Sequence, residues 1–433
     1  MKLIKTVRGW HVLLLIVLTL SLVDGSLRIR IGAGWQISTI MTIFLLMHVF
    51  TKGIVKRHKV NTFVFALVSG LIIISSAIGF LSYSDSIKIS TLIASQVSSI
   101  EERMFVEMIR LISGIAIFFL ITIYIDSKEK LLEISKYFIY GSLLQAFYAL
   151  YEFSVKFTGM VGYLPLFRGG DEHVANLPRA FGTFYEPSQL GLFIVVSVFV
   201  YMWYLSSLKV VHMNNNTQTL YKRRYLFMFI LALALLASLS RAGLIVFIAS
   251  YSIYILLNIE RLFKKPTYIL MAIFFSWIFY ELAIVLYGEN YFISWWNLVY
   301  HADKDTGNSI ASRLNGLPTY FQIVTKVLLS SPFGSGVGNL MFTYSMVPFF
   351  FRIIGELGIF ITVLYFSALT YMLVKIKTFR HSRSELFILF ISIILTQLNY
   401  NTIGHQWIWF VMSLIFVSKC INTKSSKERI ERS

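Results

Sequence analysis

Four short clusters in the sequence combine arginine with glycine, serine, proline or glutamate, and each lies between or beside long apolar runs. Arginine is a planar, permanently charged group that binds phosphate and carboxylate through two parallel hydrogen bonds. Clusters of this composition predict sites that hold anions. The four clusters are 179–188, 238–243, Arg313 with 332–339, and Arg352 with Glu356.

The first cluster is Arg179-Ala-Phe-Gly-Thr-Phe-Tyr-Glu-Pro-Ser188. Proline favours the first position of a helix, so Glu186-Pro187-Ser188 predicts a helix start. Helix N-termini favour anions, and Arg179 just ahead of such a terminus would complete a phosphate site. A surface pair between Arg179 and Glu186 that only caps the helix explains the spacing equally well.

The second cluster, Ser238-Leu-Ser-Arg-Ala-Gly243, places Arg241 between two short apolar runs with no other charge nearby in sequence. An arginine at a membrane boundary is costly to bury and is usually paired or functional. The alternative is an interfacial side chain that reaches back to water. The turn is too tight for a simple solvated loop, which favours a functional Arg241.

The third cluster joins Arg313 to Pro332-Phe-Gly-Ser-Gly-Val-Gly338. Gly334, Gly336 and Gly338 permit tight turns and close approach of the backbone to a ligand. The segment is no nucleotide-binding P-loop, because no Gly-Lys-Ser/Thr ends it. A plain re-entrant turn accounts for the glycines as well.

The fourth cluster is the pair of Arg352 and Glu356 on an apolar stretch. Their i, i+4 spacing puts both side chains on one helix face, where they can pair. Charges inside a membrane are expensive and commonly functional. A purely structural ion pair fits the same spacing.

Histidine is the usual general base, and His173, His301 and His405 lie in segments that we place on one face, the outer face. A lone histidine is more often a polar surface residue than a catalyst. The acidic clusters 171–173 and 301–305 contain carboxylates, which suit hard cations such as Mg²⁺. Solvated acidic loops explain these clusters better, so we predict no metal site.

The composition indicates that lipid surrounds most of these elements. The 433 residues are 57% hydrophobic and 14% charged, with a mean hydropathy of +0.71. Soluble domains carry roughly 45–50% apolar and about 25% charged residues. We therefore predict an all-α polytopic membrane protein that forms one domain over 1–433.

Apolar runs of helical length mark twelve predicted spans. A bilayer core of about 30 Å needs about 20 such residues. The spans are 10–23, 34–50, 60–82, 104–125, 134–155, 186–206, 225–239, 242–258, 267–287, 346–374, 386–399 and 403–418. The first follows Lys2, Lys5 and Arg8 like a signal peptide, but no small-residue cleavage site follows, so we expect it to be retained.

The charges set the orientation of these spans. If the N-terminus is cytoplasmic and the spans alternate, inner segments hold 26 of the 39 Lys and Arg and outer segments hold 11. Cytoplasmic loops collect such residues, so both termini are predicted to be cytoplasmic. This also explains the net charge of +18 without nucleic acid. Cys420 is the single cysteine, which rules out an intramolecular disulfide.

Two predicted outer loops are long, 156–185 and 288–345. The second contains an amphipathic stretch at 317–329. Loops of this length are more often functional than connective, and together they carry most of the clusters above.

The clusters, taken in order, resemble the O-antigen ligase/polymerase superfamily of bacterial inner-membrane proteins, which includes the Wzy-type polymerases. The motifs that carry the resemblance are Arg179-Ala-Phe-Gly-Thr-Phe-Tyr-Glu-Pro-Ser-Gln-Leu-Gly191, Ser240-Arg-Ala242, Arg313, 332–338 and Glu356-Leu-Gly358. Order, spacing and sidedness agree from about 165 to 375. The first 160 or so residues match only as generic membrane helices.

The resemblance implies a glycosyltransferase-C-like fold in the bacterial cytoplasmic membrane. Such proteins take a glycan from undecaprenyl diphosphate at the outer leaflet and transfer it to an acceptor hydroxyl, without nucleotide or metal. Polymerases use a second lipid-linked repeat unit as acceptor, and ligases use lipid A-core. A chain-length regulator is a further candidate partner.

The resemblance also implies roles for individual residues. It assigns Arg179, Arg241 and Arg313 to the diphosphate, whose growing negative charge they would stabilise. The ligases place a histidine shortly before the E-x-G motif, and 342–352 contains none. This favours a polymerase, with a ligase and a transporter or flippase as alternatives. The base stays open between Glu186, His301 and His405.

Further residues are expected to line the substrate site. They lie in or next to the same clusters. They are Arg168, Tyr185, Gly336, Gly338, Arg352, Glu356 and His405.

Overall fold

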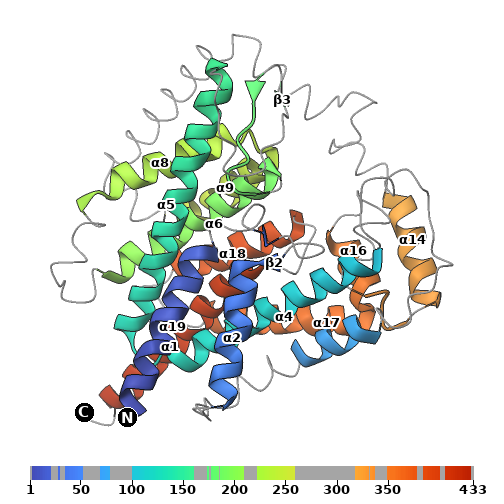
Figure 1. The fold of residues 1–433 in the computed structure, drawn as a ribbon, viewed down its shortest axis with the longest axis horizontal. Helices are drawn as coiled ribbons and strands as arrows, with labels where there is room; N and C mark the ends of the chain where they lie inside the picture. Colours follow the sequence, from blue (N-terminus) through green and yellow to red (C-terminus); the bar gives the residue numbers. More distant parts are fainter. Residues whose placement is uncertain are drawn as a thin grey trace.

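The computed structural model of the chain is built almost entirely of helices (Figure 1). It describes residues 2–20, 28–29, 35–51, 69–78, 100–159, 173–174, 177–178, 179–184, 186–208, 222–258, 317–330, 332–336, 349–377, 384–399 and 405–430. Within these ranges the predicted all-α class is confirmed. The extended residues form two antiparallel ribbons, β1 (Arg28–Ile29) with β2 (Trp35–Gln36) and β3 (His173–Val174) with β4 (Leu177–Pro178).

The described helices follow the predicted spans closely. Eleven of the twelve spans contain helix, and 267–287 lies outside the described residues. The helices are α1 (Lys2–Leu20), α2 (Ile37–Thr51), an unlabelled helix (Ser69–Ile78), α4 (Ile100–Tyr124), α5 (Lys128–Thr158), α6 (Pro187–Leu208), α8 (Arg224–Ala237), α9 (Arg241–Leu257), α14 (Leu317–Ser330), α16 (Phe349–Leu357), α17 (Ile359–Lys377), α18 (Ser384–Asn399) and α19 (Gln406–Ile430).

Two of these helices are long and apolar enough to cross a membrane, judged by length and composition. They are Met104–Tyr124, with a mean hydropathy of 2.2, and Pro187–Leu208, with 1.9. Eight further apolar helices have 10–17 residues, which is short of the roughly 20 that span a bilayer core without help. The number of crossings therefore stays a prediction.

One predicted span was wrong, because the structure divides it into two helices. The run 346–374 was expected to be a single helix, but α16 ends at Leu357 and α17 begins at Ile359. Gly358 between them has φ +79°, a left-handed conformation that cannot continue a helix. The Thr362 hydroxyl lies 2.7 Å from the Gly358 carbonyl oxygen and 3.1 Å from that of Ile353, so it satisfies carbonyls that the break leaves open.

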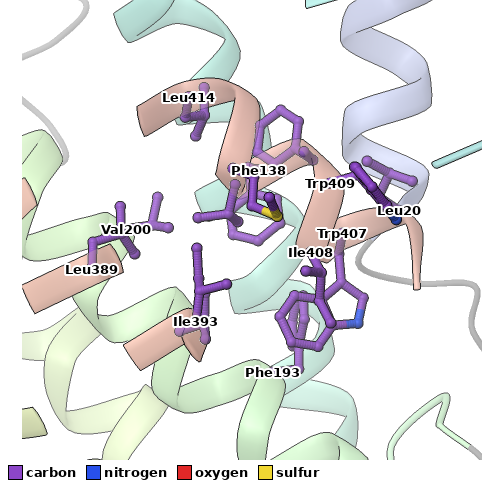
Figure 2. Close-up of a cluster of buried hydrophobic side chains, with 14 of the residues drawn as sticks. Leu20, Phe138, Phe193, Val200, Leu389, Ile393, Trp407, Ile408, Trp409 and Leu414 are labelled. Atoms are coloured by element: carbon purple, nitrogen blue, oxygen red, sulfur yellow. The ribbon is translucent and has the colours of Figure 1, made fainter. Parts of the chain in front are cut away.

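Aromatic residues from α5, α6 and α19 meet in the core (Figure 2). The rings of Phe138 and Phe410 stack with centroids 4.8 Å apart, and Phe193 meets Trp407 edge-on at 5.5 Å. Such pairs contribute about 0.5–1.5 kcal/mol each beyond the area they bury. Because Trp407 lies in the first turn of α19 and Phe193 in the second turn of α6, the two helices begin close together.

Helices α4 and α19 run parallel. The Gln406 amide donates to the Ser113 hydroxyl at 2.6 Å, and further along both helices Phe118 meets Phe416 at 5.6 Å. When the contacting residues increase in number along both helices in the same direction, the helices are parallel. The alternating topology requires this, because it predicts that both helices run from the outer to the inner face.

The remaining contacts sort the helix ends into two groups. Trp10 donates to Glu133 at 3.1 Å, so α1 and α5 begin together. Ser384 donates to Asn258 at 3.1 Å, so α18 begins where α9 ends. In Figure 1, α1 begins and α19 ends at one end of the molecule, and β3 lies at the opposite end. We call the half of the molecule on the β3 side, where α5 and α8 finish and α6 and α9 begin, the polar end, and the start of α19 borders it beside the middle of α5.

Candidate functional site

The loop that carries Arg179 is held by a buried carboxylate on α5. Glu152 is completely buried. Its Oε2 accepts from the backbone N–H groups of Phe181 at 2.9 Å and Gly182 at 2.7 Å. Its Oε1 pairs with the Lys156 ammonium at 2.7 Å. A buried charge is tolerated when it is paired and fully hydrogen-bonded, so this carboxylate fixes the loop to the end of α5.

Lys156 and Gln145 add to this anchor. The Lys156 ammonium donates to the carbonyl oxygen of Arg179 at 3.3 Å and lies 4.8 Å from the centre of the Phe181 ring. The Thr183 hydroxyl donates to Gln145 Oε1 at 2.9 Å. The backbone on both sides of the loop is thus fixed to α5, and Arg179 is presented at the polar end.

The structure brings the first two arginine clusters into contact. The Arg179 Nε–H donates to the carbonyl oxygen of Ser238 at 3.4 Å, and the Ala180 N–H donates to that of Ala237 at 2.9 Å. One helix turn deeper, the α carbons of Gly191 and Gly243 lie against each other: a Cβ on Gly243 would be 3.0 Å from the Gly191 Cα. Motifs about 50 residues apart in sequence form one unit.

The predicted tight turn around Arg241 is present. Helix α8 ends at Ala237 and α9 begins at Arg241. The Ser240 hydroxyl caps α9 by accepting from the Gly243 N–H at 3.0 Å. Leu239 has φ +45°, which costs a residue with a side chain about 1–2 kcal/mol. Such strain gathers at functional sites, and here it sets Arg241 at the first position of a helix.

The third and fourth clusters also meet. The Ser335 N–H donates to the Gly355 carbonyl oxygen at 2.9 Å, and the Gly336 N–H donates to that of Glu356 at 3.0 Å. At Gly334 and Gly358 an added Cβ would fall within 3.0 Å of the opposing backbone. The glycine-rich turn is therefore packed directly on the end of α16, where no side chain fits.

Arg352 and Glu356 form the predicted pair. Arg352 Nε lies 2.6 Å from Glu356 Oε1, and the two residues are 2% and 3% exposed. The terminal nitrogens of Arg352, Nη1 and Nη2, are buried and have no hydrogen-bond partner in the part of the chain that the structure describes.

His405 is buried and directly precedes α19, with its ring 6.5 Å from that of Trp407. The next residue, Gln406, joins three helices. It accepts from the Ser38 hydroxyl at 2.6 Å and donates to the hydroxyls of Thr39 and Ser113, each at 2.6 Å. His405 is thus held at the polar end by a buried polar network.

The other predicted residues divide into two groups. Glu186 is exposed just before α6 and accepts from the Ser188 hydroxyl at 2.9 Å, and α6 begins at Pro187 as predicted. The second group lies outside the described residues. It comprises Arg168, Tyr185, His301, Arg313, Gly338 and the side chain of Arg241.

The described residues contain no group of three or more His, Cys, Asp or Glu side chains that could hold a metal ion. The acidic clusters at 171–172 and 301–305 lie outside them, and of 173 only the backbone is described.

The sequence interpretation missed the anchor of the first cluster. It counted Lys156 only as one of the 11 basic residues of the outer segments and did not consider Glu152 or Gln145. A signal was present, since Glu152 and Lys156 are four residues apart at the end of an apolar run and such pairs meet on one helix face. The buried Gln406 network left no comparable pattern, because it joins three segments of the chain that are more than 60 residues apart.

No family model, no curated protein and no solved structure matches the chain. The chemistry of the polar end therefore rests on its own residues. They combine arginines, a lysine and helix N-termini, all of which favour an anionic ligand.

Proposed function

We propose that the chain polymerises undecaprenyl-diphosphate-linked oligosaccharide repeat units at the outer face of the bacterial cytoplasmic membrane, in the synthesis of O-antigen or capsule. The observation that carries this proposal is the pairing of the motifs behind the resemblance. The segment 179–191 meets 238–243, and 332–336 meets 355–358, through direct backbone contacts. Unrelated surface patterns would have no reason to meet in pairs.

The proposed reaction draws on one arginine from each of the first three clusters. The acceptor hydroxyl of one repeat unit attacks the anomeric carbon of another, and the bond between that carbon and the diphosphate oxygen breaks. Undecaprenyl diphosphate leaves with the bonding electrons, and Arg179, Arg241 and Arg313 stabilise its negative charge. The hydroxyl proton passes to a base. Glu186 and His405 at the polar end, and His301, are the candidates.

The orientation in the membrane is part of the proposal. The basic residues at the start of α1 and the end of α19 lie opposite the polar end (Figure 1). Because basic residues collect on the cytoplasmic side, this arrangement supports cytoplasmic termini and an outer-facing polar end. Lipid-linked glycans would then meet the site at the outer leaflet.

Reconstitution tests this function directly. Purified protein is incubated with the organism's own undecaprenyl-diphosphate repeat unit, and products are separated on a gel. We expect a ladder from the wild type and a loss of about 100-fold or more in Arg179→Ala, Arg241→Ala and Arg313→Ala, the size seen when one donor to a developing oxyanion is removed. Arg223→Ala is the matched control, since Arg223 is exposed at the opposite end of α8 and makes no capping hydrogen bond.

The alternatives give different products. Transfer to lipid A-core without a ladder would make the protein a ligase. Neither product from the native repeat unit would favour a transporter, which a flux assay in vesicles detects. A ladder that all three arginine variants retain would contradict the diphosphate role.

A further inference from the structure

The guanidinium of Arg352 is only partly used within the described residues. Its Nε–H donates to Glu356 at 2.6 Å, while Nη1 and Nη2 are buried without an acceptor. Those two nitrogens carry four N–H bonds in one plane, and one from each nitrogen points outward, in parallel, from the edge between them. Arg352 lies outside the motifs that carry the family resemblance, and its expected place in the substrate site does not say which group of the substrate this edge would bind.

Burying these N–H donors without a hydrogen-bond acceptor is energetically unfavourable. A buried donor without an acceptor costs about 1–3 kcal/mol, and more when it is charged. Glu356 balances the charge of the pair but supplies an acceptor only to Nε. An acceptor for the remaining edge therefore has to come from outside the described side chains.

The helix that carries Arg352 is held in place before any ligand binds. The carbonyl oxygens of Gly355 and Glu356 accept from the Ser335 and Gly336 N–H groups at 2.9 and 3.0 Å. The Ser75 hydroxyl reaches the carbonyl oxygens of Phe333 at 2.6 Å and Leu357 at 3.1 Å. A donor edge on such a clamped turn is preorganised, which lowers the entropy that binding costs.

We propose that the Nη1–Nη2 edge of Arg352 is a receptor for an oxyanion of the substrate, bound through two parallel hydrogen bonds. The shared chemistry is a pair of oxygens on one carbon or phosphorus atom, as in the carboxylate of an acidic sugar or the phosphate of the lipid carrier. This proposal rests on the proposed function, because that function supplies the substrate. Glu356 orients the guanidinium from its other edge.

Binding measurements on the full-length protein in lipid nanodiscs test the receptor without requiring turnover. The probes are undecaprenyl diphosphate, trigalacturonic acid and, as a neutral control, maltotriose. Arg352→Lys keeps a positive charge for Glu356 but loses the planar edge. We expect it to weaken binding of one anionic probe about tenfold to hundredfold, the loss expected for a charged hydrogen-bond pair, and to leave maltotriose unaffected.

A second variant separates binding from folding. Arg352→Met/Glu356→Leu replaces the ion pair by apolar side chains of similar volume, a change that is often neutral or stabilising for a buried pair. We expect this double variant to melt at or above the wild-type temperature and to lose binding of the same anionic probe.

Comparison of the two anionic probes identifies which part of the substrate supplies the oxyanion. A loss confined to undecaprenyl diphosphate assigns the edge to the carrier headgroup, and a loss confined to trigalacturonic acid assigns it to an acidic sugar. The proposed role of Arg352 would be contradicted if the wild-type protein bound neither anion. It would also be contradicted if the variants bound both anions as tightly as the wild type. If binding depends on Arg352 but the protein forms no ladder of products, the anion-binding role of Arg352 is supported and the polymerase function is contradicted.

Discussion

At the scale of single residues, the carboxylate of Glu152 decides where Arg179 lies. It accepts two backbone N–H groups from the loop and pairs with Lys156. Loss of the carboxylate would remove the acceptor of both N–H groups and the counter-charge that Glu152 supplies to Lys156. An arginine that must meet a diphosphate needs such a fixed backbone, because small displacements of a catalytic group are costly.

Glu152→Gln should therefore destabilise the protein. The amide keeps one acceptor oxygen but removes the charge that Glu152 supplies to the partly buried Lys156, and breaking a buried pair costs up to about 3–5 kcal/mol. Thermal unfolding in detergent measures the loss. Glu133→Gln is the control on the same helix, since Glu133 is exposed and surface changes usually stay within about 0.5 kcal/mol. Equal melting temperatures for the two variants would contradict the anchor.

At the scale of elements, the contact between α6 and α9 joins two clusters. Gly191 and Gly243 let the two backbones approach so closely that an added Cβ at Gly243 would be 2.9 Å from the Gly191 carbonyl carbon. Above this contact, Arg179 reaches the turn that starts α9. The distance between the helices therefore sets the distance between the Arg179 loop and the first residue of α9.

Gly243→Ala is expected to push these helices apart. Overpacking of this kind costs about 1–3 kcal/mol, and polymer formation should fall more steeply than stability because two arginine clusters separate. Gly70→Ala is the matched control: Gly70 is helical, and a Cβ there would meet nothing within 4 Å. It should be neutral or stabilise by up to about 1 kcal/mol. Wild-type activity in Gly243→Ala would show that the close approach is dispensable.

At the scale of the whole molecule, three buried polar groups with charged or amide side chains lie at the helix ends that the proposed orientation turns outward. The Glu152 anchor and the Gln406 network lie where α5 ends and where α19 begins, and the Arg352 pair lies in α16, ahead of α17. The Tyr365 hydroxyl on α17 accepts from Gln397 near the end of α18 at 2.8 Å, which brings α17 to the same end. An asymmetric distribution of this kind is what chemistry at one membrane face requires.

Labelling of single cysteines tests the orientation. In a Cys420→Ser background, Glu186→Cys should react with a membrane-impermeant maleimide added to intact spheroplasts, because the polar end is proposed to face outward. Lys222→Cys, at an exposed site before α8, should react only after the membrane is opened. The reverse pattern would invert the orientation and place the arginine clusters where lipid-linked glycans at the outer leaflet cannot reach them.

The sequence by itself determined where most of the described helices lie and which residues are candidates for the site. Apolar runs, Pro187 and the i, i+4 spacing of Arg352 and Glu356 act within a few residues, so the start of α6 and the pairing of Arg352 with Glu356 could be predicted. The predicted span 242–258 begins within one residue of α9 for the same reason. Local physics suffices for features of this range.

The tertiary structure alone decided which clusters meet, what anchors them and where the run 346–374 breaks. Glu152 finds its partners 29 and 30 residues away, and Ser38 finds Gln406 at a separation of 368. The break at Gly358 follows from backbone contacts with the turn at Gly334. Contacts at such separations depend on how whole helices pack, and no periodicity within one helix records them.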